Sequence, residues 1–293
     1  MSASCIFASD LHGRAGRYAV LFEAIERERP AAVFLGGDLL PHGYGRMAAS
    51  PSDAPDDFLH GVLLAGLERL RTRLSRAYPA VFVILGNDDP RAAEATVEEA
   101  ERGGLCRYMH ERCVEWRGYA VYGYACVPPT PFMLKDWERY DVSRYVDPGC
   151  IPPEEGRHTV PVEARELRQV TIAGELERLA GDADQSSAVW LFHSPPYGTL
   201  LDRAALDGRA VDHVPLDVHV GSIAIRRFIE ARQPAVTLHG HVHESARLTG
   251  GWRTRLGQTH CFSAAHDGPE LALVRFDPVA PARAERLLLA GPE

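Results

Sequence analysis

Residues 31–40 read Ala-Ala-Val-Phe-Leu-Gly-Gly-Asp-Leu-Leu, and this stretch decides which fold class the whole sequence predicts. An apolar run without polar alternation is typical of a strand that is buried on both faces. Gly36 and Gly37 end the run, because a residue without a Cβ lets the backbone turn sharply or approach a neighbour closely. Asp38 therefore lies at the carboxyl end of the predicted strand, which is the edge of an open α/β sheet where ligands bind.

Four further apolar runs end in polar side chains in the same way. They are residues 4–9 before Asp10-Leu-His12, 80–85 before Gly86-Asn87-Asp88, 188–192 before His193, and 235–238 before His239-Gly-His241-Val-His243. If these runs lie side by side in a parallel sheet, their polar side chains meet at one edge. Asp38 would then lie among them as a carboxylate that can bridge two cations.

Composition sets broad limits on the kind of protein. The chain has 293 residues, 45% of them hydrophobic and 25% charged, which is ordinary for a soluble globular protein. No apolar run approaches the roughly 20 residues of a membrane span, and the N-terminus lacks the features of a signal peptide. We therefore expect a cytoplasmic protein without membrane association. A net charge of −8 argues against an extended nucleic-acid surface.

The order of the predicted elements indicates the architecture. Helical periodicity predicts helices over residues 15–28, 59–74, 91–102, 163–180 and 220–232, while residues 113–124 predict a hairpin and residues 253–276 three short strands. We expect an α/β fold in which two mixed sheets pack face to face with helices outside, formed by a single domain over residues 1–293. Residues 126–162 form an irregular insertion rich in proline and aromatic residues. A lid, a partner surface and a loop packed on its own domain are all open readings of it.

The spacing of the polar residues indicates a metal site. Asp10 and His12 are two positions apart, so in an extended segment both point to the same side, and His241 and His243 repeat this spacing. Mixed oxygen and imidazole ligands suit Mn, Fe, Zn or Co better than calcium. Two such ions about 3.5–4 Å apart can hold the attacking and leaving oxygens of a phosphoryl displacement.

Taken in order, these motifs resemble those of the calcineurin-like metallophosphoesterases. The resemblance rests on Asp10-x-His12, Gly36-Gly37-Asp38, Gly86-Asn87, His193 and Gly240-His241-x-His243. It implies a four-layer α/β/β/α sandwich with two divalent metal ions, manganese being the favoured metal. By motif, the first ion would be held by Asp10, His12, Asp38 and His243, and the second by Asp38, Asn87, His193 and His241. Residues 193–198 and 219–222 also resemble a phosphodiesterase-like branch of the family.

One position departs from that family. Many members have a histidine after the motif asparagine, where it protonates the leaving group, but here the residue is Asp88. A carboxyl group with an ordinary pKa of about 3.9 is a poor proton donor near cations. As an anion it would also repel a dianionic monoester more than a monoanionic diester. We therefore expect a phosphodiesterase that cleaves a small phosphodiester by attack of a metal-bound hydroxide.

Several neighbouring residues are secondary candidates. His42 or His219 could replace the missing proton donor. His219 and His239 could also contact the metal ligands and orient them without binding a metal themselves. Arg14 could contact a phosphate oxygen of the substrate. Alternatively, its side chain could be solvated or could form an ion pair with Asp88.

Two other functions remain open at this point. One is a scaffold with the metallophosphoesterase fold that is weakly catalytic or inactive and acts through protein partners. The other is a phosphomonoesterase or protein phosphatase.

Overall fold

The computed structural model describes residues 3–41 and 58–291 of the chain. Within these residues the first large sheet has the strand order β14-β13-β1-β2-β3-β4. The bounds are β1 (Cys5–Ala8), β2 (Ala32–Gly36), β3 (Ala80–Ile84), β4 (Arg107–Tyr108), β13 (Leu271–Phe276) and β14 (Glu285–Leu289). Strands β1 to β4 are mutually parallel, whereas β13 and β14 complete one edge in antiparallel fashion.

The second large sheet repeats this design in the order β11-β12-β10-β7-β6-β5. Its strands are β5 (Arg112–Trp116), β6 (Tyr119–Tyr124), β7 (Val189–Phe192), β10 (Val236–His239), β11 (Arg253–Leu256) and β12 (Thr259–Ser263). The four inner strands are parallel, and the two outer ones are antiparallel. Residues in β2, β7 and β10 are buried along their whole length, as expected for strands covered on both faces.

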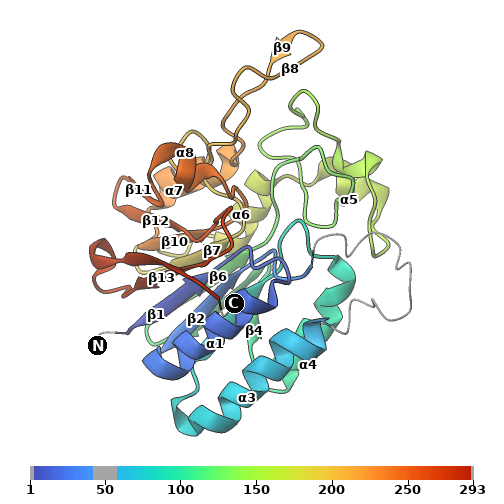
Figure 1. Ribbon diagram of the computed structural model, residues 1–293. Helices are drawn as coiled ribbons and strands as arrows, with labels where there is room; N and C mark the ends of the chain where they lie inside the picture. The colour runs from blue at the N-terminus through green and yellow to red at the C-terminus, as the bar shows by residue number, and fades with distance from the viewer. Residues whose placement is uncertain (1–2, 42–57, 292–293) are drawn as a thin grey trace.

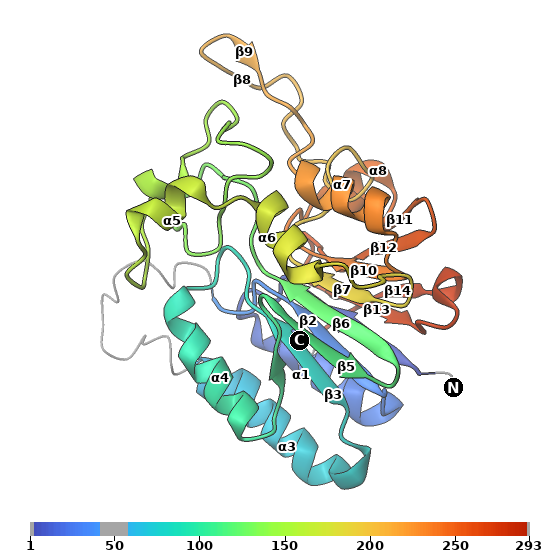
Figure 2. The ribbon, with the colours of Figure 1, turned by 180° about the vertical axis from the view of Figure 1, so that it is seen from behind.

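The two sheets pack against each other through aromatic side chains. The rings of Phe82 and Trp116 lie 6.0 Å apart between centroids, as do those of Phe262 and Phe276, and each pair joins one sheet to the other. Helices α1 (Ala15–Glu28), α3 (Ala65–Leu74) and α4 (Glu94–Arg102) cover the outer side of the first sheet, while α6 (Ile172–Ala180) and α7 (Ile223–Arg232) cover the second (Figures 1 and 2). The expected four-layer α/β/β/α sandwich is therefore confirmed.

Four of the five predicted helices differ from the structure. Those over 91–102 and 220–232 differ only at their starts, where the first begins with a 3-10 turn (Arg91–Ala93) and the second begins at Ile223. Residues 163–180 do not form one helix but two, α5 (Ala164–Gln169) and α6, because Val170 is extended and the side chain of Thr171 caps α6 by accepting a hydrogen bond from the Gly174 N–H. The helix predicted over 59–74 starts with a π-helical segment, η2 (Leu59–Leu64), before α3.

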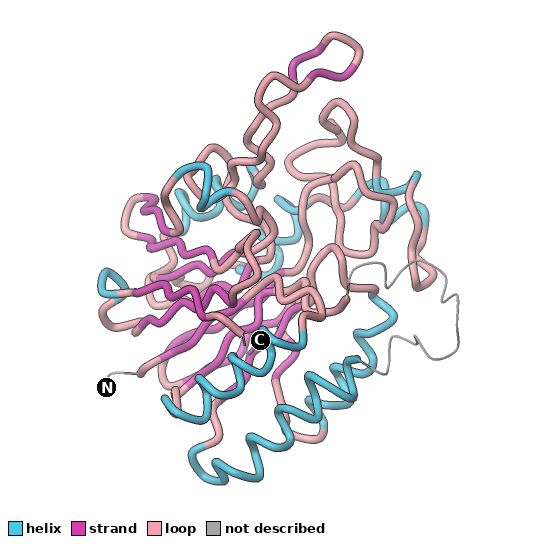
Figure 3. The backbone as a smooth tube through the Cα atoms, viewed as in Figure 1, coloured by secondary structure: helices cyan, strands magenta, loops and turns pink. Residues whose placement is uncertain are grey.

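Loops and turns gather beyond the carboxyl ends of the parallel strands (Figure 3). They include the short helix α8 (Ser245–Thr249) and a projecting hairpin of β8 (Ala210–Val211) and β9 (Val214–Pro215). Three-residue 3-10 turns occur at η3 (Ser75–Ala77), η4 (Arg91–Ala93), η5 (Pro153–Glu155) and η6 (Pro281–Arg283). None of the described helices combines the length and the apolar character needed to cross a bilayer.

Candidate metal centre

Turns that follow five parallel strands bring the predicted ligands together. Asp10 follows β1, Asp38 follows β2, Asn87 follows β3, His193 follows β7, and His241 and His243 follow β10. One group of ligand atoms, from Asp10, His12, Asp38 and His243, lies within 4.8 Å of one another, and so does a second, from Asp38, His193 and His241. Asp38 belongs to both groups, so its carboxylate lies between two potential cation positions.

The backbone at these turns is unusual. Asp10, His12, Asp38 and His241 have φ angles of 59°, 48°, 52° and 71°. These angles lie in the left-handed region that side chains other than glycine rarely adopt, and such conformations cluster at functional sites. The expectation that Asp10 and His12 converge because their segment is extended is therefore wrong. They converge through a tight turn, in which the Asp10 and His12 amides donate to the carbonyls of Gly37 and Asp38.

The first group combines two imidazoles with two carboxylates. His12 Nε2 lies 2.8 Å from His243 Nε2, and His243 Nε2 lies 3.1 Å from Asp10 Oδ1. Asp38 Oδ2 is 3.9 Å from His12 Nε2. The other carboxylate oxygen of Asp10, Oδ2, is buried and has no hydrogen-bond partner within the described residues. A buried carboxylate oxygen of this kind requires a compensating charge or donor, which a divalent cation supplies.

The second group is organised around His193. Its Nδ1 hydrogen bonds to the Gly36 carbonyl at 2.7 Å, which fixes the ring with Nε2 toward the site. That Nε2 lies 3.3 Å from Asp38 Oδ2 and 3.1 Å from Asn87 Oδ1. The ring of His241 is 5.3 Å from that of His193 between centroids. Asn87 thus joins the second group through its amide oxygen.

The protonation of these residues reflects their burial and mutual charges. Burial alone raises the pKa of Asp10, but the hydrogen bond and charge of His243 outweigh it and bring that pKa down to about 2. The pKa of Asp38 is lowered in the same way, chiefly by His193. Burial lowers the pKa of His241 to about 3, and His193 adds to the effect. In the opposite direction, Asp38 outweighs burial and raises the pKa of His193 to about 10, and Asp10 raises that of His243. The carboxylates are therefore ionised, and a cation that binds here would displace the protons of these two imidazoles.

Two glycines leave room for these ligands. A Cβ on Gly240 would come within 2.6 Å of Asp10 Oδ2, and one on Gly86 would overlap Asp38 Oδ1. Together with the unpartnered Asp10 oxygen and the mixed oxygen and nitrogen donor set, this shows that the residues present fit two divalent cations.

Two supporting residues escaped the sequence prediction. The buried carboxylate of Asp89 accepts the amides of Leu39, Leu40 and Gly86 at 2.8–3.1 Å, so it ties the turn of Asp38 to that of Asn87. The buried guanidinium of Arg17 donates to the carbonyls of Asp10 and Gly268. The only available signal was the position of Asp89 between a motif asparagine and a proline, where a turn is expected.

Three further residues that the sequence predicted for the site, Asp88, Arg14 and His239, differ in their contacts. The Asp88 amide donates to Asp38 Oδ1 at 2.9 Å, and its carboxylate is 3.6 Å from His12 Nδ1. Arg14 is exposed and donates to the Gly268 carbonyl. His239 is buried and bonded to the Ser194 carbonyl and the Thr237 hydroxyl.

Of the two candidate proton donors, one can be placed. His219 Nδ1 is 2.9 Å from Oδ1 of Asp202, whose side chain is buried. His42 lies outside the described residues.

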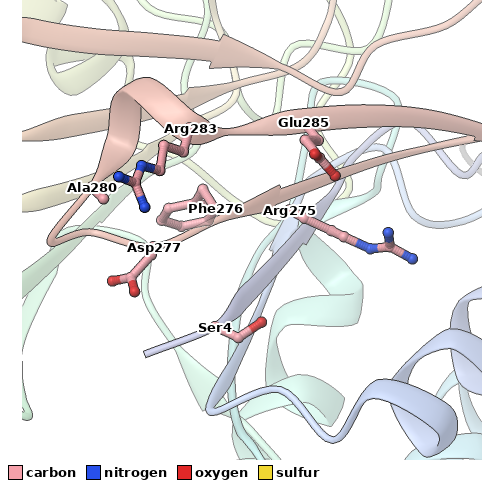
Figure 4. A pocket seen from close by; sticks show the side chains of 7 residues that line it. All are labelled: Ser4, Arg275, Phe276, Asp277, Ala280, Arg283 and Glu285. Carbon is pink, nitrogen blue, oxygen red and sulfur yellow. The ribbon is translucent and has the colours of Figure 1, made fainter. Parts of the chain in front are cut away.

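A surface hollow of about 300 Å³ lies elsewhere, lined by Ser4, Arg275, Phe276, Asp277, Ala280, Arg283 and Glu285 (Figure 4). Ser4 precedes β1, and the antiparallel β13 ends beside it, so this hollow is at the amino end of β1, opposite the ligand cluster. Its two arginines extend to opposite sides of Phe276 and do not converge on a common point.

Comparison with known proteins agrees with this geometry. Residues 4–245 match the family described as calcineurin-like phosphoesterase. No curated protein sequence matches the chain. The structure is similar to that of TT1561 from Thermus thermophilus, with a TM-score of 0.56, 18% identity, and coverage of 98% of this chain and 99% of the other. It is also similar to a dimetal phosphatase from Danio rerio, with a TM-score of 0.51, 13% identity, and coverage of 99% of each chain. At these identities the two likenesses show the fold alone.

Proposed function

The chain belongs to the calcineurin-like phosphoesterase family, and we propose that within this family of metal-dependent hydrolases it is a phosphodiesterase acting on a small phosphodiester. The family binds two divalent metals. We assign the first to Asp10, His12, Asp38 and His243 and the second to Asp38, Asn87, His193 and His241. The observation that carries this assignment is the shared position of Asp38, whose carboxylate belongs to both groups of ligand atoms.

The chemistry is divided between the cations and the protein. Divalent ions at this site would polarise the phosphate ester and activate water for attack on phosphorus, and manganese suits the mixed donors. The protein holds the ligands in place: the Gly36 carbonyl orients His193, and Asp89 fixes the turns of Asp38 and Asn87 relative to each other. Such supporting contacts keep ligands preorganised, so little reorganisation is needed when substrate binds.

Asp88 supports the choice of a diester over a monoester. Its carboxylate is partly exposed beside His12, at the edge of the cluster. A monoester carries two negative charges and a diester one, so the repulsion from Asp88 penalises the monoester more. Because an ordinary carboxyl group is ionised at neutral pH, another residue is needed to protonate the leaving group.

We propose His219 as the donor of that proton. Asp202 is fully buried and accepts His219 Nδ1 together with the amides of Gly198, Thr199 and Gly221, which fixes the imidazole. Because His219 Nδ1 is hydrogen bonded to the Asp202 carboxylate, Nε2 is the nitrogen that can exchange a proton with a substrate, as in other His–Asp pairs. Arg14, two residues after His12, is exposed and donates to the Gly268 carbonyl, and we propose that it also contacts a phosphate oxygen.

Hydrolysis of bis-p-nitrophenyl phosphate with added Mn²⁺ tests the function. We expect activity in the wild type and none in Asp38→Asn, and we expect Asp88→His to raise the activity on p-nitrophenyl phosphate. Faster wild-type hydrolysis of the monoester than of the diester would contradict the proposal. A metal-loaded wild type that cleaves neither ester would favour a scaffold.

His219 is tested separately by the leaving group. His219→Gln should slow a diester with an alkyl leaving group far more than one with p-nitrophenolate, which leaves without a proton. Equal losses on both esters would exclude His219 as the proton donor.

A further inference from the structure

The insertion, residues 126–162, lies beyond the carboxyl ends of the strands, beside α5 (Figures 1 and 2). Apart from η5 and isolated bridges it has no regular structure. Its contacts nevertheless reach both halves of the sandwich. Residues 136 and 137 contact a turn of the first sheet, and Asp141, four residues further along, contacts the start of a helix on the second sheet.

The contact with the first sheet involves the turn that carries Asn87. The Trp137 indole N–H donates to the Asp89 carbonyl at 2.8 Å, and Asp136 Oδ2 accepts the Arg91 amide at 2.8 Å. The Arg91 guanidinium in turn lies 5.6 Å from the centroid of the Trp137 ring. Trp137 is completely buried, so its hydrogen bond is shielded from water. The turn is thereby fastened to the insertion two residues after Asn87.

The contact with the second sheet involves the N-terminus of α7. Asp141 accepts the Ser222 hydroxyl at 2.6 Å and the amides of Ile223 and Ala224 at 2.7 and 3.1 Å. A carboxylate at this position satisfies helix amides and interacts favourably with the helix dipole. The Ser222 amide donates to the Pro195 carbonyl, two residues after His193. Asp141 is thus linked to the turn of His193 by two successive hydrogen bonds.

Between these two contacts the insertion is a packed structure rather than a mobile flap. Lys135 and Glu138 are fully buried and form an ion pair of 2.5 Å, and Thr130 donates to both Glu138 oxygens. Opening this segment would expose or separate two buried charges, which is costly. This packing argues against the reading of the insertion as a mobile lid.

We infer that the insertion sets the spacing between Asn87 and His193 and so controls the affinity of the second cation. Asn87 and His193 come from different sheets and occur only in the second ligand group, and the insertion fastens the turns of both. Trp137 and Asp141 are then positioning residues that act on the metal site without touching it. This inference rests on the ligand assignment of the proposed function.

Metal titration of the full-length protein tests the inference without relying on activity. The metal-stripped protein is titrated with Mn²⁺ by calorimetry, and the affinities of the two sites are fitted separately. Trp137→Phe keeps an aromatic ring but removes the donor to Asp89. We expect the second cation to bind about 10-fold more weakly and the first to change less than about 2-fold, because loss of a supporting contact typically costs 10–100-fold in metal affinity.

Two further variants make the result specific. Tyr140→Phe is the matched control, since it removes a hydroxyl bonded to Glu154 from another buried aromatic ring of the insertion. It should leave both affinities unchanged. Asp141→Asn acts through the other contact, at the start of α7, and should weaken the binding of the second cation as Trp137→Phe does. It covers the case in which Trp137→Phe fails to fold.

The different failures can be told apart. A wild type that binds two cations, with unchanged affinities in Trp137→Phe and Asp141→Asn, overturns the inference alone. Equal weakening of both sites, or the same weakening in Tyr140→Phe, also overturns it, because it would indicate general loosening. A wild type that takes up only one cation overturns the ligand assignment and the inference with it.

Discussion

The ion pair of Lys135 and Glu138 should be strongly coupled, and a double-mutant cycle can measure the coupling. Both side chains are fully buried. Lys135 Nζ also donates to the Thr130 carbonyl at 2.7 Å, and Glu138 also accepts the Thr130 amide and hydroxyl. Removing one partner leaves the other as a buried group without its counter-charge. We expect Lys135→Met and Glu138→Gln each to lower the free energy of unfolding by about 3–5 kcal/mol.

The double variant should be far less destabilised than the sum of the single ones. With both charges gone, the introduced glutamine can still accept from Thr130, and the introduced methionine fills a volume similar to that of the lysine, so we expect a loss of about 1–2 kcal/mol. Urea unfolding at about pH 8, above the raised pKa of Glu138 so that the pair is charged, gives the three free energies when followed by fluorescence, provided that the m-values agree. Additive effects of the two single substitutions would refute the reasoning. Additivity would show that water reaches the charges of Lys135 and Glu138 and that the two are not a solvent-shielded ion pair.

Three further predictions follow from the supporting contacts. Asp89→Asn should weaken cation binding about 10–100-fold. The carboxylate of Asp89 offers two acceptor oxygens to three backbone amides, whereas the amide of asparagine offers only one. Metal affinities equal to those of the wild type would exclude this role. Gly240→Ala should abolish binding at the first cation site, because its Cβ would clash with the Ser9 hydroxyl and with Asp10 Oδ2. In the control Gly16→Ala in α1 the added Cβ meets no atom within 4 Å, so this variant should bind normally in the same titration. Burial raises the pKa of Glu138 to about 7 despite the charge of Lys135, so the folded state binds the proton more tightly than the unfolded state. Stability should therefore fall as the pH rises from about 4.5 to 7, and the Lys135→Met/Glu138→Gln variant should lack this part of the pH dependence in urea unfolding; an identical slope in both proteins would contradict it.

The sequence by itself determined the strands and the kinds of ligand at their ends. Short apolar runs such as residues 31–35, ended by glycine, favour inner strands, and the polar residues that follow then lie at the carboxyl edge of a parallel sheet. This local pattern predicts two mixed sheets with helices outside and polar side chains at one edge, because burial and backbone freedom are properties of each short segment. The four-layer sandwich and the two ligand sets followed from the resemblance of the ordered motifs to a known family.

Only the tertiary structure decided how those ends are held. The left-handed turns at Asp10 and His12, the link that Asp89 makes between two turns, and the attachment of Trp137 and Asp141 all depend on partners distant in the sequence. The same is true of the C-terminal strands, of which β12 joins the second sheet and β13 the first. A local pattern shows that a group needs a partner, but the partner is chosen by packing and hydrogen bonding across the whole fold.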